Sequence, residues 1–210
     1  MALQIRWIAH ASFRLAAEDV VLYIDPWKLP SPKPDASLVF VSHGHFDHWS
    51  ARDVEAVSRD GTTVVGPPDV VESLPGGRVL RPGERIESAG ASIEGIPAYN
   101  VGKDFHPKAK GWLGALITLG GARVYYAGDT DKIAEMSGLS GVDVALLPVG
   151  GTYTMNAAQA ALACQAIGAR IAIPYHWGDI VGSESDARAF VDAAAGWDAR
   201  LLRPGEAISV

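Results

Sequence analysis

The sequence predicts one mixed α/β (α+β) domain over residues 1–210, in which two packed β-sheets carry helices on their outer faces. Short apolar runs separated by Gly, Pro and Asp favour strands, because helices need longer periodic segments. Residues 20–25 and 122–129 both run apolar and end in an aspartate at a turn, as equivalent strands of two sheets would. No linker, low-complexity stretch or charge run divides the chain.

The first half of the chain is predicted to alternate strands with two short helices. Ser50 is suited to cap a helix over residues 50–59, in which Val54 and Val57 stand three positions apart on one face. A second short helix is predicted over residues 69–74. The strands predicted around these helices are residues 4–8, 13–15, 20–24, 38–41, 63–65 and 93–96.

The second half repeats this order with longer helices. Asn156 and Gln159 have the spacing of a capping box and begin an alanine-rich helix over residues 156–167, which Gly168 ends. The other predicted elements are strands over residues 115–119, 123–126, 144–148, 171–174 and 207–210 and a helix over residues 184–195.

The composition excludes several classes of protein. A net charge of −6 and a pI near 5.5 argue against a nucleic-acid partner. No segment approaches the roughly 18 consecutive apolar residues of a membrane span, and the first seven residues lack the pattern of a signal peptide. The single cysteine, Cys164, excludes an intrachain disulfide and a cysteine-cluster metal site. We therefore expect a cytoplasmic protein without a membrane partner, whose oligomeric state the composition leaves open.

The strongest chemical signal directly follows the predicted strand 38–41. Three of the chain's six histidines and one aspartate stand within six positions, at His43, His45, Asp47 and His48. Alternate loop residues can turn to the same centre, so His43 and His45 suit one metal ion. Asp47 and His48 then suit a second. Imidazole and carboxylate favour zinc, with manganese, iron and nickel as alternatives. The competing interpretation is a surface histidine cluster that binds nothing.

This motif has the form His-x-His-x-Asp-His, and with it the chain resembles the metallo-β-lactamase-fold hydrolases nearly from end to end. The resemblance implies a four-layer αββα sandwich with a two-metal site at one edge of the sheets. It implies that Asp25 orients the site without binding metal and that Asp129 bridges both ions. It also implies that His176 joins Asp47 and His48 around the second ion.

The resemblance is weaker where a third histidine is expected for the first ion. Residues 97–100 occupy that position and contain none, and the next histidine along the chain is His106. Either the insertion 101–104 carries His106 into the site, or Asn100 or water completes the coordination there.

Further residues near these landmarks are candidates for contact with a substrate. Lys108, flanked by Lys103 and Lys110, could receive an anionic group or simply be solvated. Tyr153 is either a hydrogen-bond donor to the substrate or a packed loop residue. His10 either contacts the substrate and acts as an acid, or is a hydrogen-bonded turn histidine.

Two further segments narrow the expected function. Residues 7–12 and 150–154 resemble those of small bacterial and archaeal hydrolases similar to L-ascorbate-6-phosphate lactonase and N-acylphosphatidylethanolamine phospholipase D. We expect a binuclear hydrolase whose metal-bridging hydroxide attacks a small, anionic ester, lactone or phosphodiester, with Asp47 shuttling the proton. The alternatives are a metal-stabilised binding protein without turnover and a non-haem iron redox enzyme on the same fold.

Overall fold

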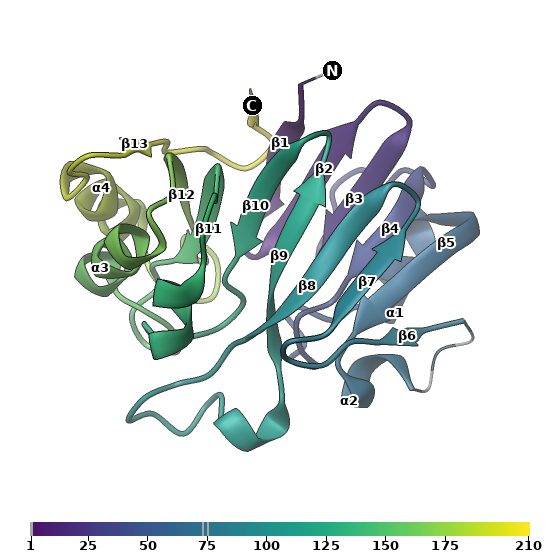
Figure 1. The fold of residues 1–210 in the computed structure, drawn as a ribbon, viewed down its shortest axis with the longest axis horizontal. Coiled ribbons are helices and arrows are strands. Elements are labelled where there is room, and N and C mark those ends of the chain that lie inside the picture. The colour runs from purple at the N-terminus through teal and green to yellow at the C-terminus, as the bar shows by residue number, and fades with distance from the viewer. Residues whose placement is uncertain (1, 73, 75) are drawn as a thin grey trace.

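The computed structural model describes residues 2–72, 74 and 76–210, and it contains two seven-stranded sheets that face each other (Figure 1). The first sheet consists of β1 (Gln4–Ala9), β2 (Ser12–Ala17), β3 (Val20–Ile24), β4 (Ala36–Phe40), β5 (Ser58–Gly66), β6 (Arg78–Val79) and β14 (Ala207–Ser209). Its order is β14-β1-β2-β3-β4-β5-β6. The pairs from β14 to β3 are antiparallel, and those from β3 to β6 are parallel.

The second sheet repeats this plan. Its strands are β7 (Arg85–Ser88), β8 (Ala91–Pro97), β9 (Leu113–Leu119), β10 (Ala122–Tyr126), β11 (Val144–Pro148), β12 (Ile171–Tyr175) and β13 (Asp198–Ala199). The order is β13-β12-β11-β10-β9-β8-β7, antiparallel from β7 to β10 and parallel from β10 to β13. The two segments with similar sequence patterns, in β3 and β10, therefore occupy the same place in their sheets, where pairing changes from antiparallel to parallel.

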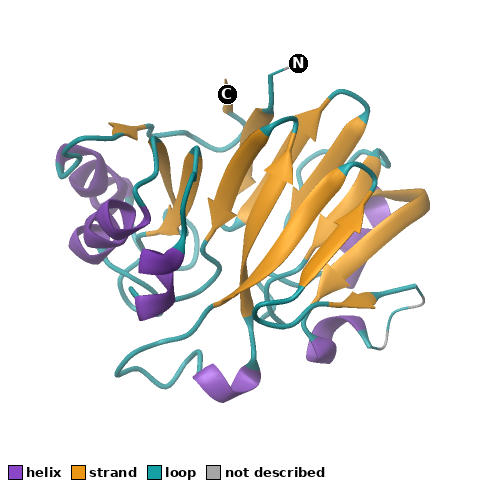
Figure 2. Cartoon of the chain, viewed as in Figure 1, coloured by secondary structure: helices purple, strands orange, loops and turns teal. Residues whose placement is uncertain are grey.

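Helices cover the outer faces of both sheets (Figure 2). The valines of α1 (Ala51–Val57) and α2 (Pro68–Val71) pack on the first sheet around Val39 of β4. On the other side, α3 (Ala157–Ile167) packs on β11 and α4 (Glu184–Asp192) on β12. Two short 3₁₀ helices, η1 (Lys108–Lys110) and η2 (Ala134–Gly138), lie in loops. The four layers confirm the predicted αββα sandwich.

Local signals set several element ends. The Ser50 side chain accepts a hydrogen bond from the Asp53 backbone N–H, and the Asn156 capping box forms as predicted. The prediction was too long for three helices. The chain turns extended at Ser58 and enters β5, α4 ends at Asp192, and α2 ends at Val71. Ser73, in the predicted 69–74 helix, lies outside the described residues.

The core between the sheets follows from alternation along the strands. In β2, Phe13 and Leu15 are fully buried while Arg14 between them points outward. Strand β4 is buried on both faces, because the second sheet covers one and α1 the other. Cys164 of α3 is also buried, which raises the pKa of its thiol to about 12. Within the described part of the chain, no helix is long and apolar enough to cross a membrane.

Candidate metal centre

The proposed metal ligands come together at one edge of the two sheets. They follow the ends of β4, β10 and β12, and one more comes from the long loop between β8 and β9, which extends beyond the sheets (Figure 1). Carboxyl ends of parallel strands meet at one edge, so residues far apart in the sequence become neighbours there. All six histidines of the chain lie in this cluster.

Among the described residues, three groups of side chains have ligand atoms within 4.8 Å of one another, and the third, Asp25, His43 and His48, overlaps the other two. The two groups that share no residue could each hold a metal ion. One set is His43, His45 and His106, and the other is His10, Asp47, His48 and His176.

Asp129 lies between the two sets. Its Oδ2 is 3.3 Å from Nε2 of His106 in the first set and 3.2 Å from Nε2 of His176 in the second. Its Oδ1 is 3.2 Å from Nε2 of His48. One carboxylate therefore contacts both sets, which is the position that the sequence resemblance implied for a bridging ligand.

Several buried nitrogen and oxygen atoms at the centre lack a hydrogen bond of suitable geometry. Nε2 of His48, His106 and His176 and Oδ1 of Asp129 have no hydrogen-bond partner among the described residues. Buried polar atoms without partners are costly, and several that converge on one point are suited to bind an ion. Imidazole nitrogens and carboxylate oxygens are donors that zinc prefers, so the residues fit a metal centre.

Asp25 directs the ring of His48 towards this centre. Its carboxylate accepts hydrogen bonds from His48 Nδ1 (2.7 Å), Ser42 N (2.7 Å), Ser42 Oγ (2.5 Å) and Tyr126 OH (2.6 Å). Because the Ser42 hydroxyl donates to Asp25, His43 Nδ1–H must donate to Ser42 Oγ at 2.9 Å. Both histidines thus present Nε2 to the cluster, and Asp25 occupies the orienting position expected of it.

Asn100 orients the ring of His106 towards the centre. Its Oδ1 accepts hydrogen bonds from the His106 backbone N–H and from His106 Nδ1, both at 3.0 Å. Its amide nitrogen donates to the Tyr153 carbonyl at 2.9 Å. Of the two alternatives for the first ion, the structure turns His106 towards the centre. Asn100, which was also a candidate for contact with the substrate, holds the His106 ring and is not among the described residues that line the cavity.

His10 contacts Asp47 rather than an open surface. His10 Nε2 lies 3.1 Å from Asp47 Oδ2, and the ring is buried beside His176 with centroids 4.1 Å apart. Backbone φ is positive at His10 (43°), Asp25 (43°) and His176 (63°), a strained region for residues other than glycine. Such strain persists only where the surroundings hold it, and it concentrates at functional sites.

Burial and neighbouring charges shift the pKa values at the centre in both directions. Burial lowers the pKa of His43 well below its usual value and also lowers that of His45, so both imidazoles are neutral. Burial opposes ionisation of Asp129, but His176 and His48 outweigh it and hold its pKa well below the usual range. Burial also acts against the charge on His48, yet Asp129 and Asp25 raise its pKa well above normal.

A cavity of about 300 Å³ opens onto this cluster. Its inner wall consists of His45, Asp47, His106 and Asp129. Its outer wall consists of Phe46, Phe105, Tyr153 and Ile180. Tyr153 is thus placed where the sequence predicted a substrate contact. The three apolar residues of the outer wall were not predicted, although Phe46 inside a polar motif and Phe105 beside His106 were visible signals.

The lysines near His106 are engaged elsewhere. Lys108 Nζ pairs with Glu135 at 2.9 Å and lies 4.4 Å from the Tyr99 ring centre. Lys103 pairs with Asp131. No lysine or arginine is among the described residues that line the cavity. The expected role of Lys108 in binding an anionic substrate therefore has no support in this arrangement.

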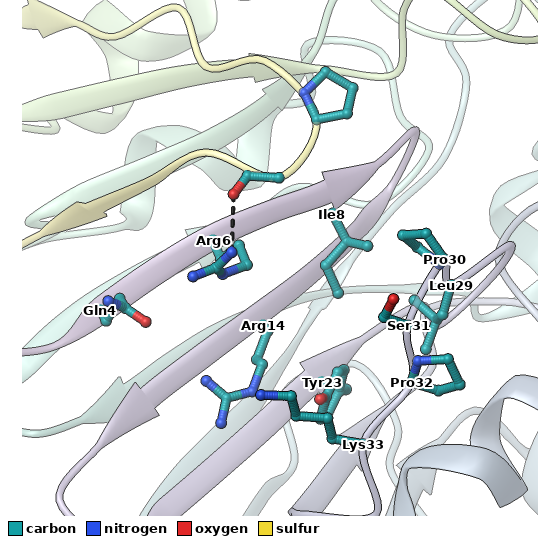
Figure 3. Close-up of a pocket in the computed structure, with 12 residues that line it drawn as sticks. Gln4, Arg6, Ile8, Arg14, Tyr23, Leu29, Pro30, Ser31, Pro32 and Lys33 are labelled. Carbon is teal, nitrogen blue, oxygen red and sulfur yellow. Dashed lines mark hydrogen bonds between the residues drawn. The ribbon is translucent and has the colours of Figure 1, made fainter.

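A second cavity, of about 500 Å³, lies on the outer face of β1 to β3 (Figure 3). Arg6, Arg14, Tyr23 and Lys33 project around it. Arg14 is paired with Asp35 at 2.7 Å. This cavity contains none of the histidines, so its size does not make it the candidate active site.

Comparison with known proteins agrees with this geometry. Residues 4–176 match the family model described as a beta-lactamase superfamily domain. A UPF0173 metal-dependent hydrolase of Methanoregula boonei is 32% identical, over 99% of this chain and 98% of the relative. The chain belongs to the UPF0173 metal-dependent hydrolases of the beta-lactamase superfamily. Another member, from Nitratidesulfovibrio vulgaris, is 34% identical over 100% of this chain and 96% of its own.

A solved structure supports the fold of this family member as well. Igni18, a metallo hydrolase from Ignicoccus hospitalis, superposes with a TM-score of 0.82 at 27% identity, covering 100% of this chain and 99% of that one. The predicted family, fold and hydrolase class are thereby confirmed.

Proposed function

We propose that this protein is a binuclear zinc hydrolase that cleaves an ester, lactone or phosphodiester bond in a small molecule. The observation that carries the proposal is the contact of Asp129 with both histidine sets, at the floor of a cavity. Two ions sharing one carboxylate are the arrangement that two-metal hydrolysis needs.

The residues divide into two ligand sets around Asp129. His43, His45 and His106 would hold one ion, and Asp47, His48 and His176 would hold the other. When bound, two such ions supply Lewis acidity and an activated water nucleophile at neutral pH.

Asp47 has a second task in the proposal. It lines the cavity. Burial opposes its ionisation, but the hydrogen bond with His10 and the nearby His48 together lower its pKa, which keeps the carboxylate ionised. An ionised carboxylate at this place can take up the proton that leaves during hydrolysis. His10 then acts as a positioning residue, which holds the Asp47 carboxylate in place at the cavity.

The proposal is tested by metal analysis combined with a substrate panel. We expect about two zinc ions per chain and hydrolysis of at least one of a phosphodiester, a lactone and a thioester, lost with a chelator and with Asp47→Ala. Two ions without turnover on any substrate would favour a binding protein. Iron with oxygen-dependent turnover would favour a redox enzyme.

His106→Ala tests the division into two sets. Because His106 supplies one of three imidazoles to the first set, its loss is expected to lower the metal content from two towards one ion per chain. Lys108→Ala is the matched control two positions away, and it should retain both ions since Lys108 lies outside the cavity. Two tightly bound ions in the His106 variant would assign this residue to the substrate loop instead.

A further inference from the structure

We propose that the outer wall of the active-site cavity binds an uncharged alkyl or aryl group next to the bond that is cleaved. The substrate class would then be esters or lactones that carry an apolar group, bound by Phe46, Phe105, Ile180 and Tyr153. This inference rests on the proposed hydrolase function and specifies its substrate.

The distribution of exposed apolar side chains carries the inference. Among the described residues, five large hydrophobic side chains are exposed: Phe46 (68%), Val101 (62%), Leu162 (54%), Phe105 (46%) and Ile180 (38%). Three of them line the cavity that opens onto the candidate metal ligands, and Val101 belongs to the same loop as Phe105. Apolar surface gathered at one concave place marks a binding site, whereas scattered residues would need no explanation.

These side chains are held in place by their neighbours. The Phe46 ring meets the edge of Trp27 at 6.0 Å between centroids, and the Phe105 ring meets Tyr153 edge-on at 4.8 Å. Aromatic pairs of this geometry add stability beyond the area that they bury. The wall is therefore formed before a ligand arrives, which lowers the entropic cost of binding.

An ion pair holds the loop that carries Ile180, the remaining apolar residue of the wall. Ile180 follows Asp179, whose carboxylate accepts hydrogen bonds from Lys28 Nζ at 3.0 and 3.2 Å. Lys28 Nζ also lies 4.2 Å from the Trp27 ring centre. The loop that carries Ile180 is thus tied to the residue against which Phe46 packs.

The charges around the cavity argue against an anionic group at this wall. Apart from the phenol of Tyr153, its ionisable residues are Asp47, Asp129, His45 and His106, all of which belong to the candidate metal cluster. The nearby Lys103 and Lys108 are paired with Asp131 and Glu135. An anionic group at the wall would lose hydration and find no cationic side chain among the described residues that line it, whereas an apolar group gains by leaving water.

An ester series of increasing chain length tests the inference on the metal-loaded protein. From p-nitrophenyl acetate to butyrate, we expect kcat/KM to rise about tenfold, because burial of each methylene contributes roughly a factor of three to four. The exposed positions of Phe46 and Phe105 make Phe46→Ser and Phe105→Ser tolerable for the fold, and both should flatten the series. Leu162→Ser, which removes an equally exposed side chain on α3 outside the cavity, should leave the series unchanged.

A binding measurement keeps this test separate from that of the hydrolase activity. We expect the neutral fluorophore N-phenyl-1-naphthylamine to bind the wild type and the Leu162 variant, and to bind at least fivefold more weakly to the two Phe variants. Binding with this pattern but without turnover would remove the hydrolase proposal and leave the apolar site. Turnover with a flat ester series, or equal binding by all four proteins, would overturn the apolar site and leave the hydrolase proposal.

Discussion

Asp129→Ala is expected to lower kcat/KM by about three to four orders of magnitude, the largest effect on activity of any single change. The carboxylate contacts both ligand sets, through His106 on one side and His48 and His176 on the other. In the proposed binuclear site, its loss would remove the link between two ions that together stabilise the transition state by several kcal/mol, and each 1.36 kcal/mol is about a tenfold change in rate.

Metal analysis distinguishes this effect from general damage. The Asp129 variant should bind fewer than two zinc ions per chain while its far-UV circular dichroism stays like that of the wild type. Asp131→Asn is the matched control, since Asp131 is also buried but pairs with Lys103 and accepts a hydrogen bond from the Val101 backbone. It should keep both ions, and an Asp129 variant that did so with full activity would contradict the bridging role.

Asp25→Ala is expected to cause the largest loss of stability, about 3–5 kcal/mol, because it leaves buried donors without their acceptor. The Asp25 carboxylate is fully buried and serves Ser42, His48 and Tyr126. Tyr126 belongs to the second sheet, so the lost contacts include one between the sheets. In a chain of this size, such a loss lowers the melting temperature by roughly 6–20 °C.

The melts should be compared in a chelator, because bound metal stabilises the folded state of each variant to a different degree. Tyr126→Phe is the graded control: it removes one of the four donors and should cost about 1 kcal/mol. Equal melting temperatures for Asp25→Ala and the wild type would show that water replaces the carboxylate and that the network contributes little to the fold.

The fold was largely predictable because its signals are local. The strands of the core alternate or run apolar, and the caps at Ser50 and Asn156 form as their spacing indicates. The strands that escaped prediction were β6, β7 and β13, which are only two to four residues long. Such short strands depend on pairing with a neighbour more than on their own propensity.

The metal centre was predictable only in part. The cluster from His43 to His48 is a single local motif, and a resemblance supplied Asp25, Asp129 and His176. Whether His106 lies at the site was left open, because its position depends on how the loop between β8 and β9 folds. In the structure, Asn100 Oδ1 holds His106 at the site through one hydrogen bond from its backbone N–H and one from its ring.

By itself, the sequence determined the sandwich, the family and the types of ligand, because strand periodicity, caps and the His-x-His-x-Asp-His spacing act over a few residues. Only the tertiary structure decided what the cavity presents to a substrate. In the folded chain, Lys108 pairs with Glu135, 27 positions further along, rather than facing the cavity. Phe46, Phe105 and Ile180 come from three separate loops and line the same cavity. Contacts over such separations depend on the packing of whole sheets, which no local pattern encodes.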